Sequence, residues 1–283
     1  MLETIIASIG YAGGVIVDKI ILSIYSIPVR RFIPWLFIWL AIITVFAVYV
    51  FHGSFNLEAL KLNNLILFAA MIVVAFVWNL FYYEGIQRVE VHEFELVMLF
   101  GPLATIILAE IFLPSERSIT TFAAGLIASS ALVLARVEKK HLRLSPYWKQ
   151  LFAATFLIAL ESILLKKLLV IYDPTTLYLL RTFILAIAFL IAFRPKLLQV
   201  PKSVFALTIA SAFFGVVQMV LKFYGFQNIG VVETTLILIL GPVLVYFLSS
   251  FFLKEKLRAK TGISALVVIA CVVYVVVTNG QGH

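Results

Sequence analysis

Glu161 is the residue whose position points most directly to chemistry. It lies about ten residues into the apolar run Leu151–Ile171, near the middle of a predicted membrane-spanning helix. A carboxylate at that depth is costly, which indicates a proton carrier, a cation site or the partner of a basic group, and we expect Glu161 to be the protonatable group. Lys166 and Lys167 lie off its helix face, so an ion pair needs a partner on another helix. A paired or protonated packing residue is the alternative interpretation.

Gln218 and Lys222 form a second polar pair, because residues four apart share one face of a helix. Shifting the sequence by 140 positions places Trp78 and Tyr82 at the equivalent positions. We therefore expect a polar cavity in which Lys222 contacts an anion. The residues expected to line this cavity are Trp78, Asn79, Tyr82, Glu161, Gln218, Lys222 and Tyr224. For the aromatic residues, a belt at the membrane surface is the alternative interpretation.

Other ionisable residues lie nearer to the ends of apolar runs. Asp18-Lys19 aligns with Lys166-Lys167, and Arg181 in RTFI aligns with Arg30 in RRFI. Long basic side chains near helix ends commonly extend toward the membrane surface. We therefore expect these residues to mark topology rather than to contact a ligand.

The sequence contains no recognisable catalytic or metal-binding motif. Its four histidines are scattered without ligand spacing, and HExxH, GxSxG and a phosphate-binding loop are all absent. The single cysteine, Cys271, cannot form a disulfide within one chain. We therefore expect no catalytic residue, no metal and no cofactor, and we predict that the protein is not an enzyme.

The composition is that of a membrane protein. Hydrophobic residues make up 63% of the 283 residues, charged residues make up 13%, and the mean hydropathy is +1.11. The apolar runs are continuous and long, which predicts an all-α polytopic membrane protein rather than a β-barrel. The ten predicted transmembrane helices are Ile5–Leu22, Phe32–Phe51, Leu65–Tyr83, Phe94–Leu113, Ile119–Ala135, Leu151–Ile171, Thr176–Phe193, Val204–Leu221, Val231–Leu253 and Ile263–Thr278.

The chain repeats itself at half its length. Residues 96–113, LVMLFGPLATIILAEIFL, have a second copy in residues 236–253, LILILGPVLVYFLSSFFL, and the shift of 140 superimposes Gly101-Pro102 on Gly241-Pro242. A proline in a helix leaves the carbonyl four residues earlier without its hydrogen bond. Matching interruptions in two repeats indicate a hinge or a binding site, with packing and kinks alone as the alternative.

The number of helices in each half determines the topology. Because five is odd, the second half enters the membrane from the opposite face, so we predict two inverted five-helix repeats. They occupy residues 1–136 and 150–283, joined by a basic connector in residues 137–149. The positive-inside rule places both termini outside. The net charge of +8 lies in short connections and therefore reports orientation, not a nucleic-acid partner.

With these features, the chain resembles the EamA-type branch of the drug/metabolite transporter superfamily over nearly its whole length. The resemblance rests on VHEFELVMLFGPLATIILAEIF and VVETTLILILGPVLVYFLSSFF, each followed by a glutamate in the turn and a glycine in the next helix. These residues are Glu116 with Gly125 and Glu255 with Gly262, and the second pair is two residues closer together.

The resemblance implies a central cavity, alternating access and, as in many relatives, efflux of small metabolites or drugs. It places Pro102 and Pro242 on the family's proline and transfers no catalytic residue. A departure from the family pattern is the set of basic residues near helix ends, Lys19, Lys166, Lys167, Arg181 and Lys222. These residues favour a substrate that carries a carboxylate or a phosphate.

We predict a secondary transporter that moves a small metabolite or drug-like solute, including an anionic one, by alternating access. A flippase for lipids or lipid-linked precursors and a membrane scaffold without transport are the alternatives, and the shape of the cavity distinguishes them. The expected partners are the substrate and membrane lipids, without nucleic acid, in a monomer or homodimer. The first apolar run is expected to be a retained span rather than a signal peptide. Short loops and the lack of appended domains suit a prokaryotic inner membrane.

Overall fold

The computed structural model describes residues 1–89, 94, 97–136, 147–195, 201–252 and 259–280, and every regular element in these ranges is helical. The α-helices are α1 (Leu2–Lys19), α2 (Val29–Val50), α3 (Leu62–Arg88), α5 (Phe100–Phe112), α6 (Ile119–Arg136), α7 (Trp148–Leu168), α8 (Pro174–Phe193), α9 (Lys202–Asn228), α10 (Val231–Leu238), α11 (Leu240–Phe252) and α12 (Ala259–Gly280). A π-helical turn, Ile20–Ile24, extends α1, and short 3₁₀ helices span Leu57–Leu60 and Pro114–Glu116. The prediction of an all-helical fold is confirmed for the described residues.

The boundaries around α8 and α10 follow from the local sequence. Asp173 caps α8, because its Oδ1 accepts hydrogen bonds from the backbone N–H of Thr175 at 2.9 Å and of Thr176 at 3.2 Å. Pro174 occupies the first turn of that helix, where a missing N–H costs nothing. Gly230 precedes α10 with a φ of +90°, which glycine adopts without a clash of Cβ.

Leu99 and Ile239 interrupt the two proline-containing helices at equivalent positions. Leu99 has φ −62° and ψ −20°, directly before α5, and Ile239 has φ −59° and ψ −20°, between α10 and α11. Three residues later, Pro102 and Pro242 have no N–H to donate to the carbonyl four residues earlier. The interruptions are therefore a local consequence of the repeated Gly-Pro sequence.

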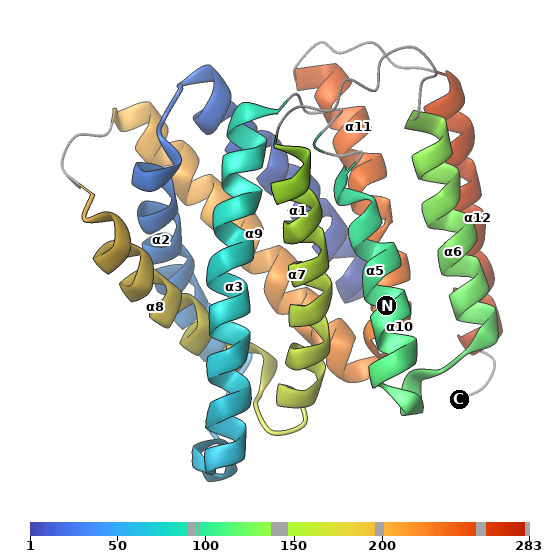
Figure 1. Ribbon diagram of the computed structural model, residues 1–283, viewed down its shortest axis with the longest axis horizontal. Helices are drawn as coiled ribbons and strands as arrows, with labels where there is room; N and C mark the ends of the chain where they lie inside the picture. The colour runs from blue at the N-terminus through green and yellow to red at the C-terminus, as the bar shows by residue number, and fades with distance from the viewer. Residues whose placement is uncertain (90–93, 95–96, 137–146, 196–200, 253–258, 281–283) are drawn as a thin grey trace.

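The helices of the two halves interlock. α1 packs against α9, α3 against α7, α2 against α8, and α6 against α12. Figure 1 shows α2 and α8 at one end of the bundle and α6 and α12 side by side at the other, running in opposite directions. The two halves therefore share one interior instead of forming separate bundles.

Two lysines make equivalent contacts in the two halves. Nζ of Lys19 donates to the carbonyl of Ile86 at 2.9 Å, near the end of α3. Nζ of Lys166 donates to the carbonyl of Phe226 at 2.5 Å, near the end of α9, and Phe226 lies 140 positions after Ile86. Each ammonium satisfies a carbonyl of a helix C-terminus, where the helix dipole favours positive charge.

Two glutamines repeat the same relation. Nε2 of Gln87 lies 3.5 Å from the carbonyl oxygen of Leu22, and Nε2 of Gln227 lies 3.2 Å from that of Leu169. Gln227 follows Gln87 by 140 positions, and Leu169 follows Leu22 by 147, the offset that also relates Lys166 to Lys19. The sequence alignment of Asp18-Lys19 with Lys166-Lys167 is therefore displaced by one residue. Contacts near these helix ends are thus preserved between the halves.

Five helical segments are long and apolar enough to cross a membrane. They are Leu2–Ile24, Val29–Val50, Leu62–Arg88, Pro174–Phe193 and Lys202–Asn228. Other apolar helices in the described ranges are shorter, and α7 carries four charged residues, Lys149, Glu161, Lys166 and Lys167. The count of ten transmembrane helices therefore stays a prediction.

Large apolar side chains are exposed on the outer faces of several helices. Examples are Val45 and Phe46 on α2, Val73 on α3, and Ile187 and Ile191 on α8. A surface of this kind is costly in water, whereas in a bilayer it faces hydrocarbon. The outside of the bundle is therefore suited to lipid, and the polar groups discussed next lie inside.

Candidate functional site

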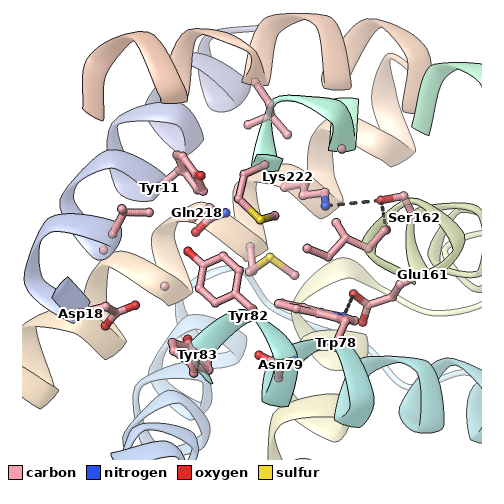
Figure 2. Close-up of a pocket in the computed structure, with 18 of the residues that line it drawn as sticks. Tyr11, Asp18, Trp78, Asn79, Tyr82, Tyr83, Glu161, Ser162, Gln218 and Lys222 are labelled. Carbon is pink, nitrogen blue, oxygen red and sulfur yellow. Dashed lines mark hydrogen bonds between the residues drawn. The ribbon is translucent and has the colours of Figure 1, made fainter. Parts of the chain in front are cut away.

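A cavity of about 180 Å³ lies inside the bundle, where helices of both halves meet. Its wall includes six of the seven residues predicted to line it and three of the four residues of the Gly-Pro steps. These nine are Trp78, Asn79, Tyr82, Gly101, Pro102, Glu161, Gln218, Lys222 and Pro242. Figure 2 shows aromatic and polar side chains converging on this space from several helices.

Glu161 and Arg181 form a buried ion pair in the cavity wall. Nε of Arg181 donates to Oε1 of Glu161 at 2.7 Å, and the two residues are 2% and 1% exposed, respectively. The indole N–H of Trp78 donates to Oε2 of Glu161 at 2.7 Å. Both carboxylate oxygens therefore have a donor, which offsets the cost of burying the charge. The partner lies on α8, in agreement with the requirement that an ion pair of Glu161 comes from another helix.

The expectation that Arg181 lies near a helix end is wrong. Arg181 is the eighth residue of α8 and is buried, whereas Arg30 is the exposed second residue of α2. The match between RTFI and RRFI aligns two positions in different environments. The depth of Arg181 in its apolar run, the same signal that singled out Glu161, could have identified it.

Two basic groups in the wall keep hydrogen-bonding capacity. Nη2 of Arg181 is buried and has no hydrogen-bond partner among the described residues. Nζ of Lys222 lies 3.5 Å from the hydroxyl of Ser162, the weak limit of a hydrogen bond, and 5.0 Å from the ring centroid of Phe226. Where the structure describes the chain, Lys222 has no carboxylate within ion-pair distance. An anion in the cavity can therefore accept charge-assisted hydrogen bonds here.

Asp18 is a second buried carboxylate in the wall. It is 5% exposed and accepts a hydrogen bond from the hydroxyl of Ser211 on α9. Asp18 lies in the last turn of α1, but its side chain is buried in the cavity wall and does not extend toward the membrane surface as expected, whereas the neighbouring Lys19 satisfies a helix terminus. Figure 2 shows Asp18 on the opposite side of the pocket from Lys222 and Glu161.

The aromatic residues of α3 belong to the cavity wall and not to a belt at the lipid surface. Trp78 uses its N–H for Glu161, and its ring centroid lies 5.9 Å from that of the buried Tyr82 in an edge-to-face arrangement. Asn79 is also buried, and its side-chain amide donates to the carbonyl of Ala75 at 2.7 Å. α3 therefore contributes rigid rings and one amide to the wall.

Tyr224 and Gly241 lie outside the wall, unlike the other predicted site residues. Tyr224 follows Lys222 by two residues, about 200° around the helix, and its ring centroid lies 5.4 Å from that of Phe51. Gly241 faces α1, where a Cβ would lie only 2.7 Å from Cδ1 of Tyr11. Glycine at this position permits the close approach of α11 to α1.

The helix interruptions lie beside the cavity. Met98 and Leu238, whose carbonyls lose a helical partner to the prolines, both line it together with Pro102 and Pro242. The places where these helices can bend are therefore next to the space that a solute would occupy.

Glu116 joins the halves at one end of the bundle. Its Oε2 accepts hydrogen bonds from the backbone N–H of Val231 at 2.6 Å and of Val232 at 3.3 Å, and its Oε1 lies 3.0 Å from Nζ of Lys166. The carboxylate thus caps α10. Its repeat-related counterpart, Glu255, lies outside the described residues.

The polar groups of this site are those of a binding site. Its wall contains two basic side chains, two carboxylates and several hydroxyl and amide groups. Among the described residues, no three His, Cys, Asp or Glu side chains are placed to hold a metal ion. The arrangement can hold a small charged solute through hydrogen bonds and ion pairs.

Residues 149–277 match the model of the EamA-like transporter family. No curated protein sequence matches the chain. A crystal structure described only as that of a protein is similar over 94% of this chain and 95% of its own, with a TM-score of 0.70 and 16% sequence identity. At that identity the similarity concerns the fold alone.

Proposed function

Residues 149–277 make this chain a member of the EamA-like transporter family, part of the drug/metabolite transporter superfamily, and we propose that it carries a small anionic metabolite by alternating access. Family membership and five helices able to span a bilayer make it an integral membrane transporter of small solutes. The observation that supports an anionic substrate is the presence of Lys222 and Arg181 on the wall of one cavity.

The balance of charges in the wall favours an anion near these two residues. Glu161 compensates Arg181 through Nε only, which leaves Nη2 to a ligand. In the described part of the chain, the contacts of the Lys222 ammonium are the weak one with the neutral hydroxyl of Ser162 and the one with the ring of Phe226. A carboxylate or phosphate can accept hydrogen bonds from an ammonium and a guanidinium together, and these are stronger than bonds between neutral groups.

The size of the cavity favours a small solute. Its volume of about 180 Å³ is below the roughly 300–1,000 Å³ typical of sites for drug-sized ligands. A flippase would need room for a lipid or lipid-linked precursor, which this volume does not offer. A scaffold without transport would leave the cavity and the buried charges of Glu161, Arg181 and Lys222 as unexplained costs.

Alternating access would come from rocking of two inverted five-helix halves. The equivalent interruptions at Leu99 and Ile239 support this mechanism, because they provide a bending point in each half beside the cavity. The repeated contacts of Lys19 and Lys166 support the relation between the halves. In the proposed topology, ten transmembrane helices surround the site and both termini lie outside.

The proposed direction is efflux, as the family resemblance implies. The sequence has no ATP-binding motif, so a gradient of substrate, proton or counter-substrate would drive transport. We further propose that the protein resides in a prokaryotic inner membrane as a monomer or homodimer.

Substrate-induced thermal stabilisation of the purified protein tests the function. The screen contains amino acids, organic acids, phosphorylated sugars and cationic drugs. We expect one anionic class to raise Tm, since a ligand at about 100 times its Kd stabilises the folded state by about 2.7 kcal/mol. Lys222→Ala should abolish this shift, whereas Lys167→Ala, which changes an exposed lysine on α7, should retain it.

The pattern of shifts separates the alternatives. Stabilisation by cationic drugs alone would contradict an anionic substrate. Failure of every class with a folded protein would favour the flippase or the scaffold. If an anionic compound still raises Tm in Lys222→Ala, Lys222 is not part of the recognition site.

A further inference from the structure

Asp18 and Glu161 are two buried carboxylates of one cavity with different partners. Glu161 receives hydrogen bonds from Arg181 and Trp78, both at 2.7 Å. Asp18 receives one from the neutral hydroxyl of Ser211, and no basic side chain pairs with it in the described part of the chain. The charge of Glu161 is therefore compensated by the protein, and the charge of Asp18 is not.

The groups around Asp18 do not supply a counter-charge. Lys19, next to it on α1, extends to the carbonyls of Ile86 and Val89 at 2.9 and 2.6 Å. α9 contributes Ser211, and α3 contributes the phenols of Tyr82 and Tyr83, which carry no positive charge. α2 contributes apolar side chains, Leu36, Phe37 and Leu40, to the same cavity. An ionised carboxylate in this setting is costly, so it gains stability by taking up a cation.

The donor set around Asp18 fits a proton better than a metal ion. Calcium takes six to eight oxygen ligands and magnesium six, whereas this position offers the carboxylate and one hydroxyl. A proton needs a single oxygen and removes the charge completely. The cavity can then close over Asp18 without burying a net charge.

Asp18 is separated from the proposed anion site. Its partner Ser211 and Lys222 both lie on the continuous helix α9, eleven residues apart, which is about 16 Å at the rise of an α-helix. A small anion held at Lys222 therefore leaves Asp18 accessible within the same cavity. Two ligands that bind to one moving cavity are thermodynamically coupled if the two access states bind them differently.

We propose that Asp18 is the proton-binding site through which a pH gradient is coupled to transport. The proposal rests on the proposed transport function. It assigns the proton to Asp18 and leaves Glu161 as the structural partner of Arg181.

Infrared titration of the purified protein tests the site without any substrate, with the proton itself as the probe. We expect a protonated carboxyl band that disappears as pH rises, and its loss in Asp18→Asn. Asp173→Asn is the matched control, because Asp173 caps α8 away from the cavity and asparagine also caps helices. Ser211→Ala should keep the band and move its titration to higher pH, because the hydroxyl stabilises the ionised form.

Transport in proteoliposomes tests the coupling, with radiolabelled succinate, glutamate and a hexose phosphate as probes. At one-to-one coupling, one pH unit corresponds to about a tenfold accumulation ratio. For both the wild type and Asp173→Asn, we expect a pH gradient in one direction to accelerate uptake and a gradient in the other direction to slow it. Uptake by Asp18→Asn should not respond to the gradient.

The outcomes separate this proposal from the transport function. Uptake by the wild type that ignores the gradient would overturn proton coupling and leave the transporter intact. If the titrating carboxyl band of the wild type is unchanged in Asp18→Asn, the proton binds to another carboxyl group. This conclusion holds even if no probe is transported. Loss of cationic-ligand binding in Asp18→Asn, without a titrating band in the wild type, would make Asp18 a substrate contact. If Asp18→Asn does not fold, the titration of Ser211→Ala still tests the proposal. A carboxyl band that titrates at the same pH in Ser211→Ala as in the wild type would exclude Asp18 as the proton-binding site.

Discussion

The two halves of the molecule agree where helices end and differ where the cavity lies. Near the ends, Lys19 and Lys166 contact the carbonyls of Ile86 and Phe226, residues 140 positions apart. In the cavity, Trp78 and Tyr82 of α3 correspond to Gln218 and Lys222 of α9, a change from rings to polar and charged groups. All four of these cavity residues line one space.

This difference indicates which contacts require the same residue type in both halves. Carbonyls at a helix end need a donor in each half, so the same contact serves both. A solute in the cavity would touch each half with different chemical groups, so the cavity residues would be free to diverge. We infer that symmetry-related residues hold the bundle and asymmetric residues recognise the solute.

The largest expected effect comes from breaking the asymmetric ion pair. Arg181→Met leaves Glu161 as a buried charge without its counter-ion, which should reduce the free energy of unfolding by about 3–5 kcal/mol. Chemical unfolding in detergent measures this change. The double variant Glu161→Gln with Arg181→Met should lose less free energy of unfolding than Arg181→Met alone. An equal or larger loss would show that charge compensation is not the reason why Arg181 stabilises the fold.

The symmetric lysines should each contribute less, and by similar amounts. Lys19→Met removes charge-assisted hydrogen bonds to the carbonyls of Ile86 and Val89, and Lys166→Met removes one to the carbonyl of Phe226 together with the 3.0 Å ion pair to Glu116. A charge-assisted hydrogen bond is worth about 1.5–3 kcal/mol. Thermal unfolding of both variants under the same conditions tests the comparison, and a negligible effect of either would show that the contacts are not equivalent.

The prolines should affect transport more than stability. Pro102→Ala or Pro242→Ala restores an N–H and straightens one half, so we expect uptake to slow about tenfold, which corresponds to about 1.4 kcal/mol in the barrier. Initial rates in proteoliposomes measure this effect. The control is Pro28→Ala, because Pro28 precedes α2 and lies outside the cavity wall. If Pro28→Ala slows uptake equally, the slowing in the other variants is not caused by loss of the helix interruptions.

The smallest effect should come from the exposed pair of Glu58 and Lys61. Nζ of Lys61 lies 2.6 Å from Oε1 of Glu58 and holds the pKa of that carboxyl below its usual value. Stability from such a group is present above its unfolded-state pKa and is lost as pH falls through its folded-state pKa. Because water screens both groups, Lys61→Ala should leave Tm unchanged between neutral and acidic pH. A clear drop of Tm at neutral pH would contradict this.

Much of the helical architecture could be predicted because its causes are local. Apolar runs predicted α1, α2, α3, α8 and α9, and the repeated Gly-Pro predicted where two helices are interrupted. Six polar or aromatic residues were assigned to one cavity from helical spacing and the repeat. Tyr224 was misplaced because it was assigned by its proximity in sequence to Lys222, without regard to the turn of the helix.

The sequence by itself determined the membrane class, the repeat of 140 residues and the depth of Glu161, since hydropathy and proline chemistry act over short distances. Only the tertiary structure decided that Arg181 compensates Glu161 and that Asp18 has no such partner among the residues that the structure describes. The reason is physical, because whether a buried charge is compensated depends on side chains from other helices, and their positions arise when the two halves pack together.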